Sequence, residues 1–184
     1  MDLTDEDKRT LLHAARMSIE HAVKGQDIPQ LGTISDVLRQ PSGAFVTLNK
    51  RGELRGCIGY TEAHKPLLET VSEVAVKAAL EDPRFVPVAE EELDDVVLEI
   101  SVLSPLRRIS RIQDIEVGRH GLVVERGYCR GLLLPQVAEE YHWDRDAFLK
   151  STARKAGLPA DAWKDPETSI YVFTAEIFRE EDRN

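Results

Sequence analysis

Alternating apolar and polar positions predict two β-hairpins. Gly43–Tyr60 holds two alternating runs that flank Asn49-Lys50-Arg51-Gly52, which is typical of a hairpin with glycine in its turn. Gly121–Val124 and Arg130–Leu134 flank Glu125-Arg126-Gly127 in the same way. Each of these patterns favours a pair of antiparallel strands joined by a short turn.

Two longer alternating runs predict single strands. Asp95–Ser104 alternates with its valine, leucine and isoleucine positions directed inward, so Glu99 and Ser101 are expected on the opposite face. Ser169–Arg179 alternates in the same manner and predicts one further strand.

Apolar residues at helical spacing predict the helices. Thr4 followed by three acidic residues marks the start of the first helix, and Gly25 marks its end. Pro66 stands at a first-turn position of a second helix. The predicted helices cover residues 4–24, 66–81, 135–142 and 144–157, with a single turn at 35–39. Strands mixed with helices in this way predict an α+β fold with antiparallel sheets.

The two hairpins are similar in sequence. Arg51–Gly56 (RGELRG) and Arg126–Gly131 (RGYCRG) match at four positions, which predicts an internal duplication of a hairpin-plus-helix unit. The alternative is a chance match, since arginine and glycine are common near hairpin turns. In the duplicated alignment Leu132 stands where Cys57 stands, so only the first copy carries the thiol at that position.

Composition and charge narrow the class of protein. Of 184 residues 42% are hydrophobic and 31% are charged, which is ordinary for a globular protein. The acidic N-terminus lacks an apolar segment and no run approaches the ~20 apolar residues of a membrane span, so we expect a cytosolic protein with no signal peptide and no membrane association. The net charge of −9 argues against nucleic acid as a partner, although a local basic patch stays open.

Cysteine and histidine are too sparse to indicate a metal site. The chain has two cysteines, Cys57 and Cys129, and five scattered histidines. Their spacing matches neither a zinc motif nor a disulfide framework, and a cytosolic compartment keeps both thiols reduced. We therefore expect no metal, and the cofactor is unknown from the sequence.

The first hairpin carries the sharpest candidate for chemistry. Strict alternation places Arg55, Cys57 and Gly59 on one face, which brings a cation beside a thiol and favours the reactive thiolate. Gly56 and Gly59 weaken the strand and often mark a position where a ligand approaches the backbone. The alternative is that Cys57 is a small buried residue chosen for its fit.

Other candidates complete the predicted site. His120 precedes the second hairpin and is the best available base, with a hydrogen-bonding structural role as the alternative. Glu99 and Ser101 either line a cleft or belong to a solvated strand face. Arg130 repeats Arg55 in the second hairpin and is a candidate for a second anion contact. We predict Cys57, His120 and Glu99 as catalytic, and Arg55, Gly56, Gly59, Ser101 and Arg130 as substrate-binding.

Six segments in order resemble the AMME syndrome candidate-gene protein family, whose microbial members are called AmmeMemoRadiSam system protein A. They are LRGCIG (54–59), DPRFVPV (82–88), EISVLSPL (99–106), HGLVV (120–124), GLLLPQVAEE (131–140) and KAGLP (155–159). The resemblance covers nearly the whole chain, residues 1–184 as a single AMME-type domain. It implies an α+β fold of two unequal lobes with antiparallel sheets.

The resemblance supplies no established activity. It implies a role in a modification pathway together with a radical S-adenosylmethionine (SAM) enzyme and a Memo-type protein. Two functions therefore stay open. One is a Cys57-centred enzyme or catalytic subunit of that pathway, and the other is a noncatalytic module that presents the Leu54–Gly59 strand as a docking groove for these partners.

Overall fold

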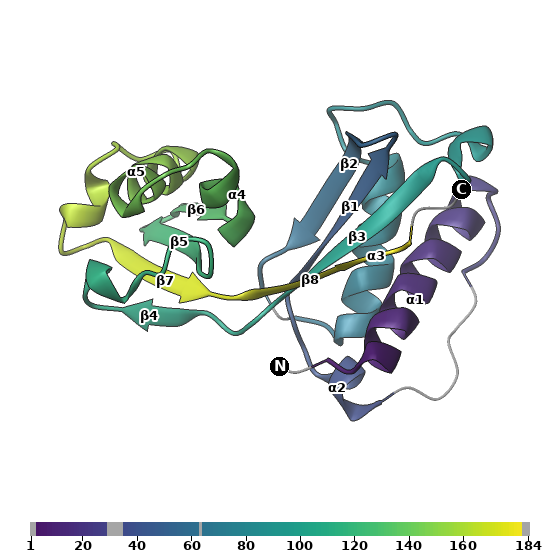
Figure 1. The fold of residues 1–184 in the computed structure, drawn as a ribbon, viewed down its shortest axis with the longest axis horizontal. Helices are drawn as coiled ribbons and strands as arrows, with labels where there is room; N and C mark the ends of the chain where they lie inside the picture. Colours follow the sequence, from purple (N-terminus) through teal and green to yellow (C-terminus); the bar gives the residue numbers. More distant parts are fainter. Residues whose placement is uncertain (1–2, 29–34, 63, 182–184) are drawn as a thin grey trace. The chain divides into compact units, whose positions relative to one another are not determined.

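The computed structural model describes residues 3–28, 35–62 and 64–181, which form two compact units (Figure 1). Unit 1 comprises the chain up to Leu103 together with the segment from Glu176 onward, and unit 2 comprises Ser104–Ala175. Each unit contains a four-stranded antiparallel sheet accompanied by helices. The predicted α+β fold of two unequal lobes with antiparallel sheets is confirmed.

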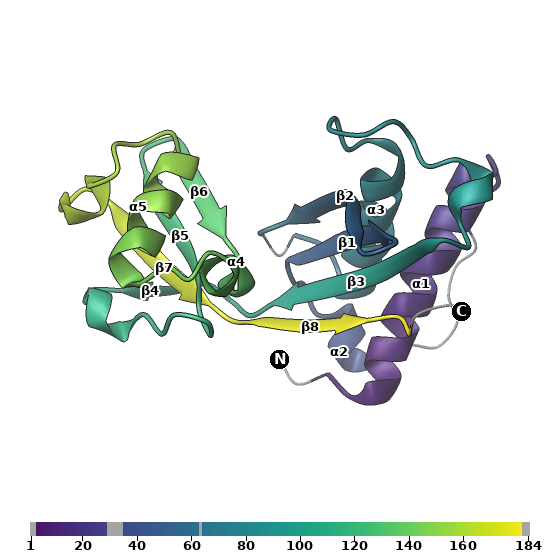
Figure 2. The same cartoon turned by 45° about the horizontal axis from the view of Figure 1, so that its top comes forward.

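Unit 1 is a sheet covered on one face by two helices. The sheet has the strand order β2-β1-β3-β8, and α1 and α3 lie side by side against the same face (Figures 1 and 2). The apolar sides of these elements form one core that includes Leu11, Val46, Val74 and Ile100. The elements are α1 (Asp5–Val23), α2 (Asp36–Arg39), β1 (Ala44–Lys50), β2 (Glu53–Tyr60), α3 (Leu67–Leu80), η1 (Glu90–Glu92), β3 (Val96–Leu103) and β8 (Ala175–Arg179).

Local sequence signals set the ends of these elements. Thr4 caps α1, because its hydroxyl accepts the backbone N–H of Asp7 while the Asp7 carboxylate accepts the N–H of Thr4. The hairpin turn needs a left-handed backbone, which Arg51 and Gly52 adopt with φ of 54° and 82°. The first hairpin and the helices that begin near Thr4 and Pro66 are therefore confirmed.

Unit 2 contains the second hairpin. Its sheet has the strand order β4-β7-β5-β6, and its core includes Leu122, Phe148, Leu149 and Val172. The elements are β4 (Arg107–Ile109), η2 (Ile112–Asp114), β5 (Gly121–Arg126), β6 (Cys129–Leu133), α4 (Pro135–Glu140), α5 (Arg145–Lys155), η3 (Ala162–Lys164) and β7 (Ser169–Phe173). Strand β4 is too short for its alternation to be recognised in the sequence.

The single strand predicted over Ser169–Arg179 is wrong. It is interrupted at Thr174 and becomes β7 of one sheet and β8 of the other. Ser104 stands at the corresponding break between β3 and β4. The Ser104 N–H donates to the Thr174 carbonyl, and the Thr174 N–H donates to Ser104 Oγ, both at 2.9 Å. The chain therefore passes from one sheet to the other twice, at two residues that are hydrogen-bonded to each other.

The two sheets have related connectivity. In each, a hairpin is followed by a helix and by a strand that pairs with the first strand of the hairpin, giving β2-β1-β3 and β6-β5-β7. The fourth position is taken by β8 in one sheet and by β4 in the other. Gly56 and Gly131 each lie directly against the backbone of a helix, α3 and α5 respectively. These parallels are consistent with an internal duplication, which stays a prediction.

Candidate functional site

The peptide groups of Cys57 are bound on both sides by side chains. Strand β2 is at the edge of its sheet. The N–H of Cys57 donates to Asp82 Oδ2 at 2.8 Å, and its carbonyl accepts from Arg84 Nη2 at 3.2 Å. Two side chains thus take the place that a neighbouring strand occupies elsewhere in a sheet. We call Asp82 and Arg84 the strand clamp.

The clamp is an ion pair around a buried carboxylate. Arg84 Nη2 lies 2.6 Å from Asp82 Oδ2, and Arg84 Nε lies 2.9 Å from Asp82 Oδ1. Asp82 is 4% exposed. The Arg84 guanidinium holds the pKa of Asp82 far below its usual value, with a further contribution from the Cys57 N–H. Asp82 is therefore ionised across the physiological pH range and can accept the Cys57 N–H throughout it.

The thiol of Cys57 points to the face of the sheet opposite α1 and α3. Thr47 is its cross-strand partner, and Glu99 is the partner of Thr47 on the next strand. Because their strand neighbours Leu48 and Leu98 face the core, Cys57, Thr47 and Glu99 form a row on the opposite face. The Thr47 hydroxyl lies 3.3 Å from Cys57 Sγ and donates to it. Cys57 is half-buried, and the contact with Thr47 orients its sulfur.

A hollow of about 410 Å³ begins at the Glu99 end of this row. Its wall combines the β1–β2 turn with strands β3 and β8, and both acidic and basic groups line it. Glu99 and Arg179 supply opposite charges to the hollow, while Arg51 is paired with Asp95 at 3.5 Å. The residues around it are Asn49, Arg51, Gly52, Asp94, Asp95, Val97, Glu99 and Arg179.

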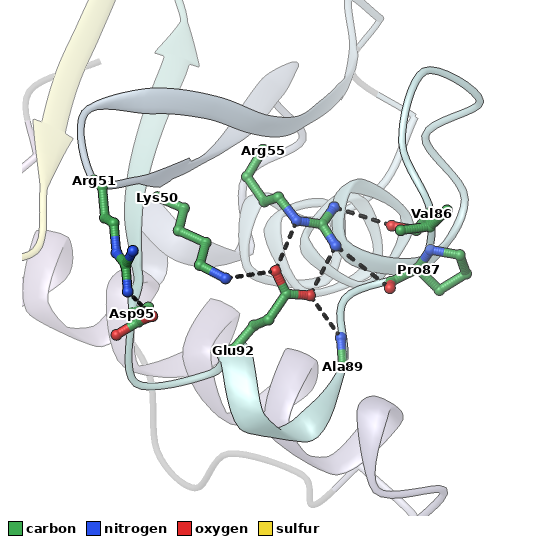
Figure 3. Close-up of polar contacts among 8 residues, drawn as sticks. All are labelled: Lys50, Arg51, Arg55, Val86, Pro87, Ala89, Glu92 and Asp95. Carbon is green, nitrogen blue, oxygen red and sulfur yellow. Dashed lines mark hydrogen bonds and ion pairs between the residues drawn. The ribbon is translucent and has the colours of Figure 1, made fainter.

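Arg55 does not share a face with Cys57, which corrects the prediction from strict alternation. The pairing shifts between Leu48, opposite Gly56, and Asn49, opposite Leu54, so Arg55 is the extra residue of a β-bulge. Its Nε and Nη2 bind the two oxygens of Glu92 at 3.1 and 2.9 Å, and Lys50 Nζ reaches the same carboxylate at 2.9 Å (Figure 3). The extra residue reverses the alternation and directs the guanidinium away from the thiol's row.

Arg55 instead anchors the segment that carries the clamp. Its guanidinium donates to the carbonyls of Val86 and Pro87 at 3.0 and 3.4 Å (Figure 3). The Phe85 ring lies 6.0 Å from the Arg55 guanidinium and 5.5 Å from that of Arg84. The LRGCIG and DPRFVPV segments therefore form one structural unit around Cys57.

The close approaches predicted at the two glycines are made by the protein itself. A Cβ on Gly56 would collide with the carbonyl oxygen of Ala78 in α3, and one on Gly59 would collide with the Phe45 ring. Gly59 also lines a second hollow of about 410 Å³, together with Tyr60 and Glu73. Packing therefore accounts for Gly56, whereas Gly59 combines packing with the wall of a hollow.

Glu99 and Ser101 lie on the predicted face, opposite the core. Ser101 is 2% exposed and is paired with Phe45, one row away from the row of Cys57. Glu99 opens onto the hollow. The structure thus places Glu99 in the row of the thiol and buries Ser101 beside it.

His120 and Arg130 belong to unit 2, so their predicted convergence with Cys57 stays a prediction. His120 is 7% exposed, and its Nδ1 accepts the backbone N–H of Glu116 at 3.0 Å. Burial lowers the pKa of His120 below 6.5. A neutral ring that accepts at Nδ1 carries its proton on Nε2, so action as a base requires the bond to Glu116 to break. Arg130 lies 3.8 Å from Glu125 across the second hairpin.

Sequence reasoning missed Thr47, Asp82 and Arg84, which bind Cys57, and Glu92, which binds Arg55. The DPRFVPV segment is the only one of the matched segments that carried a signal for the clamp, since it holds an aspartate and an arginine at i, i+2. Within residues 3–28, 35–62 and 64–181, no group of three or more histidine, cysteine, aspartate or glutamate side chains is arranged to hold a metal ion. The same residues include no helix whose length and apolar character suit a bilayer span.

Comparison with known proteins agrees with the six segments. The model of a family described as AMMECR1 matches residues 12–178. A protein of Methanothermobacter thermautotrophicus is 50% identical over 186 residues, which is 97% of each chain. Protein PH0010 of Pyrococcus horikoshii is 45% identical over 190 residues, 97% of this chain and 92% of that one. The crystal structure of uncharacterized protein PH0010 aligns with a TM-score of 0.92 at 44% identity, over 98% of this chain and 95% of that chain. The chain therefore belongs to the AMMECR1 family.

Proposed function

We propose that this protein is a catalytic subunit in which Cys57 acts as a nucleophile or carrier thiol. The proposed setting is a modification pathway shared with a radical SAM enzyme and a Memo-type protein. A thiol suits this role because it forms and releases covalent intermediates, provided that it is held accessible and in a fixed orientation.

The strand clamp is the observation that carries the proposal. Asp82 and Arg84 bind both peptide groups of Cys57, and Thr47 donates to its sulfur. A cysteine that served only to fill the core needs neither a fixed backbone on an edge strand nor a hydroxyl directed at its sulfur. The half-buried thiol lies on the face that also carries Glu99. The arrangement supports a thiol that is positioned for attack on a bound molecule.

The neighbouring residues have distinct proposed roles. The hollow beside Glu99 is the proposed substrate site, with Glu99 accepting or donating a proton and Arg179 meeting an anionic group. Arg55 holds the clamp segment in place through Glu92 and Val86, as a positioning residue. Ser101 supports the neighbouring row from its buried position. Roles for His120 as proton carrier and for Arg130 as anion contact are retained as proposals for unit 2.

Alkylation of the folded protein tests the thiol. Iodoacetamide labelling followed by peptide mass spectrometry distinguishes Cys57 from Cys129, the second half-buried thiol. We expect Cys57 to be labelled in the native state and to be protected by the substrate of the reconstituted pathway. Cys57→Ser should abolish product formation with the radical SAM enzyme and the Memo-type protein, whereas Cys129→Ser should leave it unchanged. A fully active Cys57→Ser variant would remove the catalytic role.

A docking module is the second candidate function. Leu54 and Val86 are 43% and 76% exposed, and both lie next to Arg55, which bonds to the Val86 carbonyl. Exposed apolar side chains at the edge of a sheet are typical of a protein-binding surface. This observation favours a partner that contacts the edge of β2.

One pair of variants separates the two functions. Leu54→Ser with Val86→Ser should abolish co-purification with either partner if the surface is a docking site. Cys57→Ser should leave co-purification intact in that case, because serine keeps nearly the size of the side chain and removes only the thiol. Loss of turnover with full partner binding in Cys57→Ser supports catalysis. Full turnover in Cys57→Ser, together with loss of both binding and turnover in the surface variant, supports docking alone.

A further inference from the structure

Unit 2 contains a cavity of about 730 Å³ that has no part in the proposed chemistry at Cys57. It lies where the edge strand β4, η2, η3 and the start of β7 meet. A volume of this size is in the range of pockets that hold small molecules. Its floor is apolar and includes Ile109, Ile112, Trp163 and Ile170.

The rim of this cavity is positively charged although the chain as a whole carries a net charge of −9. Arg108, Arg111 and Lys164 line it together with one acidic residue, Asp165. Arg126 neutralises Asp165 at 3.0 Å. Asp114 neutralises Arg111 at 2.9 Å.

Two positive charges therefore remain at the rim. Across residues 104–175, all of which are described, Arg108 and Lys164 make no ion pair with any acidic side chain. Lys164 Nζ instead lies 5.2 Å from the centre of the Trp163 ring. An anion is the group that two such cations attract most strongly.

Two residues that line the cavity each carry a buried polar atom without a hydrogen-bond partner among the described residues. The atoms are Trp163 Nε1 and Thr168 Oγ1, and Thr168 is 8% exposed. Indole nitrogen can only donate a hydrogen bond, so its missing partner is an acceptor. Buried donors without partners are costly, which favours an oxygen-rich occupant that reaches the wall.

We propose that this cavity binds a small molecule that joins an anionic oxygen group, a phosphate ester or a carboxylate, to an apolar body. The apolar body lies on the isoleucine floor and the Trp163 ring. The anionic group meets Arg108 and Lys164 and accepts hydrogen bonds from Trp163 Nε1 and Thr168 Oγ1. The site is independent of Cys57, so the two proposals stand or fall separately.

Indole NMR signals give a direct test, since the chain has two tryptophans, Trp143 and Trp163. A Trp163→Phe variant assigns the two indole N–H peaks of the ¹⁵N-labelled full-length protein. We then titrate with phenyl phosphate, inorganic phosphate and phenol. We expect phenyl phosphate to shift the Trp163 peak saturably, with inorganic phosphate and phenol each binding at least about tenfold more weakly because each makes only part of the contacts.

Matched charge variants locate the binding. Arg108→Gln and Lys164→Gln should each weaken phenyl phosphate binding at least about fivefold, in line with the loss of one charge-assisted contact. Lys150→Gln, an exposed cation on α5 outside the cavity, should change it less than about twofold. Thr168→Val should weaken the binding of phenyl phosphate and leave the binding of phenol unchanged.

Three results would overturn the proposal. The first is no saturable shift of the Trp163 peak with any probe in the millimolar range, which would assign the unpartnered atoms to water. The second is equal binding of phenol and phenyl phosphate, which would make the cavity purely apolar. The third is an equal effect of Arg108→Gln, Lys164→Gln and Lys150→Gln, which would indicate attraction to the overall charge alone.

Discussion

Asp82 Oδ2 accepts the backbone N–H of Cys57 at 2.8 Å across a separation of 25 residues. An ionised carboxylate thus replaces the carbonyl that a further strand would offer at this edge of the sheet. The arrangement also closes the edge to other chains at the position of the thiol. Cys57 owes its fixed backbone to a side chain from the loop that follows α3.

Asp82→Asn should weaken both the clamp and the fold. The variant keeps the shape of the side chain but loses the charge that binds Arg84, so a buried charge-assisted contact is lost. We expect the free energy of unfolding to fall by about 2 kcal/mol, measured by urea denaturation. Local opening of β2 should also raise the alkylation rate of Cys57 while that of Cys129 stays constant.

Asp27→Asn provides the matched control, because Asp27 is exposed and lies in the loop that follows α1. It should change the free energy of unfolding by less than about 0.5 kcal/mol. Equal free energies of unfolding for the Asp82→Asn and Asp27→Asn variants would show that the clamp does not contribute to stability.

Glu92 should make the protein sensitive to acid. Arg55, then Lys50, then the Ala89 N–H lower the pKa of Glu92 from 4.5 to about 2. The folded pKa lies below the unfolded one, so the stabilisation is fully present above pH ~4.5 and is lost as the pH falls toward about 2. Over this pH range the free energy of unfolding of wild type should therefore fall by on the order of 2–3 kcal/mol more than that of Glu92→Gln.

Urea denaturation at a series of pH values measures this difference. Glu91→Gln removes an adjacent exposed carboxylate from the same short helix and serves as the control. Its pH profile should follow that of wild type. Parallel profiles for Glu92→Gln and wild type would rule out the assigned coupling to Arg55.

Gly56→Ala should destabilise unit 1 through overpacking. The new Cβ would meet the carbonyl oxygen of Ala78, which is helix backbone and cannot move aside as a side chain can. We expect the free energy of unfolding, measured by urea denaturation, to fall by about 2–3 kcal/mol. Gly131→Ala meets the backbone of Ala156 in the same way, and the duplication predicts a similar loss.

Gly25→Ala separates overpacking from backbone strain. Gly25 has a φ of 65° and open space around its Cα, so the alanine costs only the left-handed conformation, about 1 kcal/mol. A loss at Gly56 no larger than that at Gly25 would contradict the close contact with α3.

His120 should titrate below pH 6.5 in the folded protein. Its burial disfavours the charged ring, so protonation of His120 destabilises the folded state. The free energy of unfolding is therefore unaffected by this residue above pH ~6.5 and falls as the pH drops through the lowered pKa. An NMR titration of the His120 ring protons gives the midpoint. His120→Gln should remove this component of the pH dependence of stability, and a midpoint above 6.5 would contradict the burial argument.

Local patterns in the sequence were sufficient for most of the elements. The cap at Thr4, the glycine turn at Gly52 and the period-2 alternation of β1 and β3 act between residues that are close in the chain, so each is legible from a short window. The order of six segments was enough to place the chain in its family. Strand β4 and the interruption at Thr174 were missed, because nothing within a short alternating run indicates which sheet it joins.

The composition of the site was decided by tertiary structure. Cys57 was identified from its own segment, but its neighbours come from elsewhere: Asp82 is 25 residues away and Thr47 is across a hairpin. The bulge at Arg55 directs that side chain away from Cys57, and the cation that contacts Cys57 is Arg84. Spacing along a chain fixes periodicity and caps, because these depend on residues within one or two turns. Which charge meets which backbone group depends on how distant segments pack, and only the folded chain determines that.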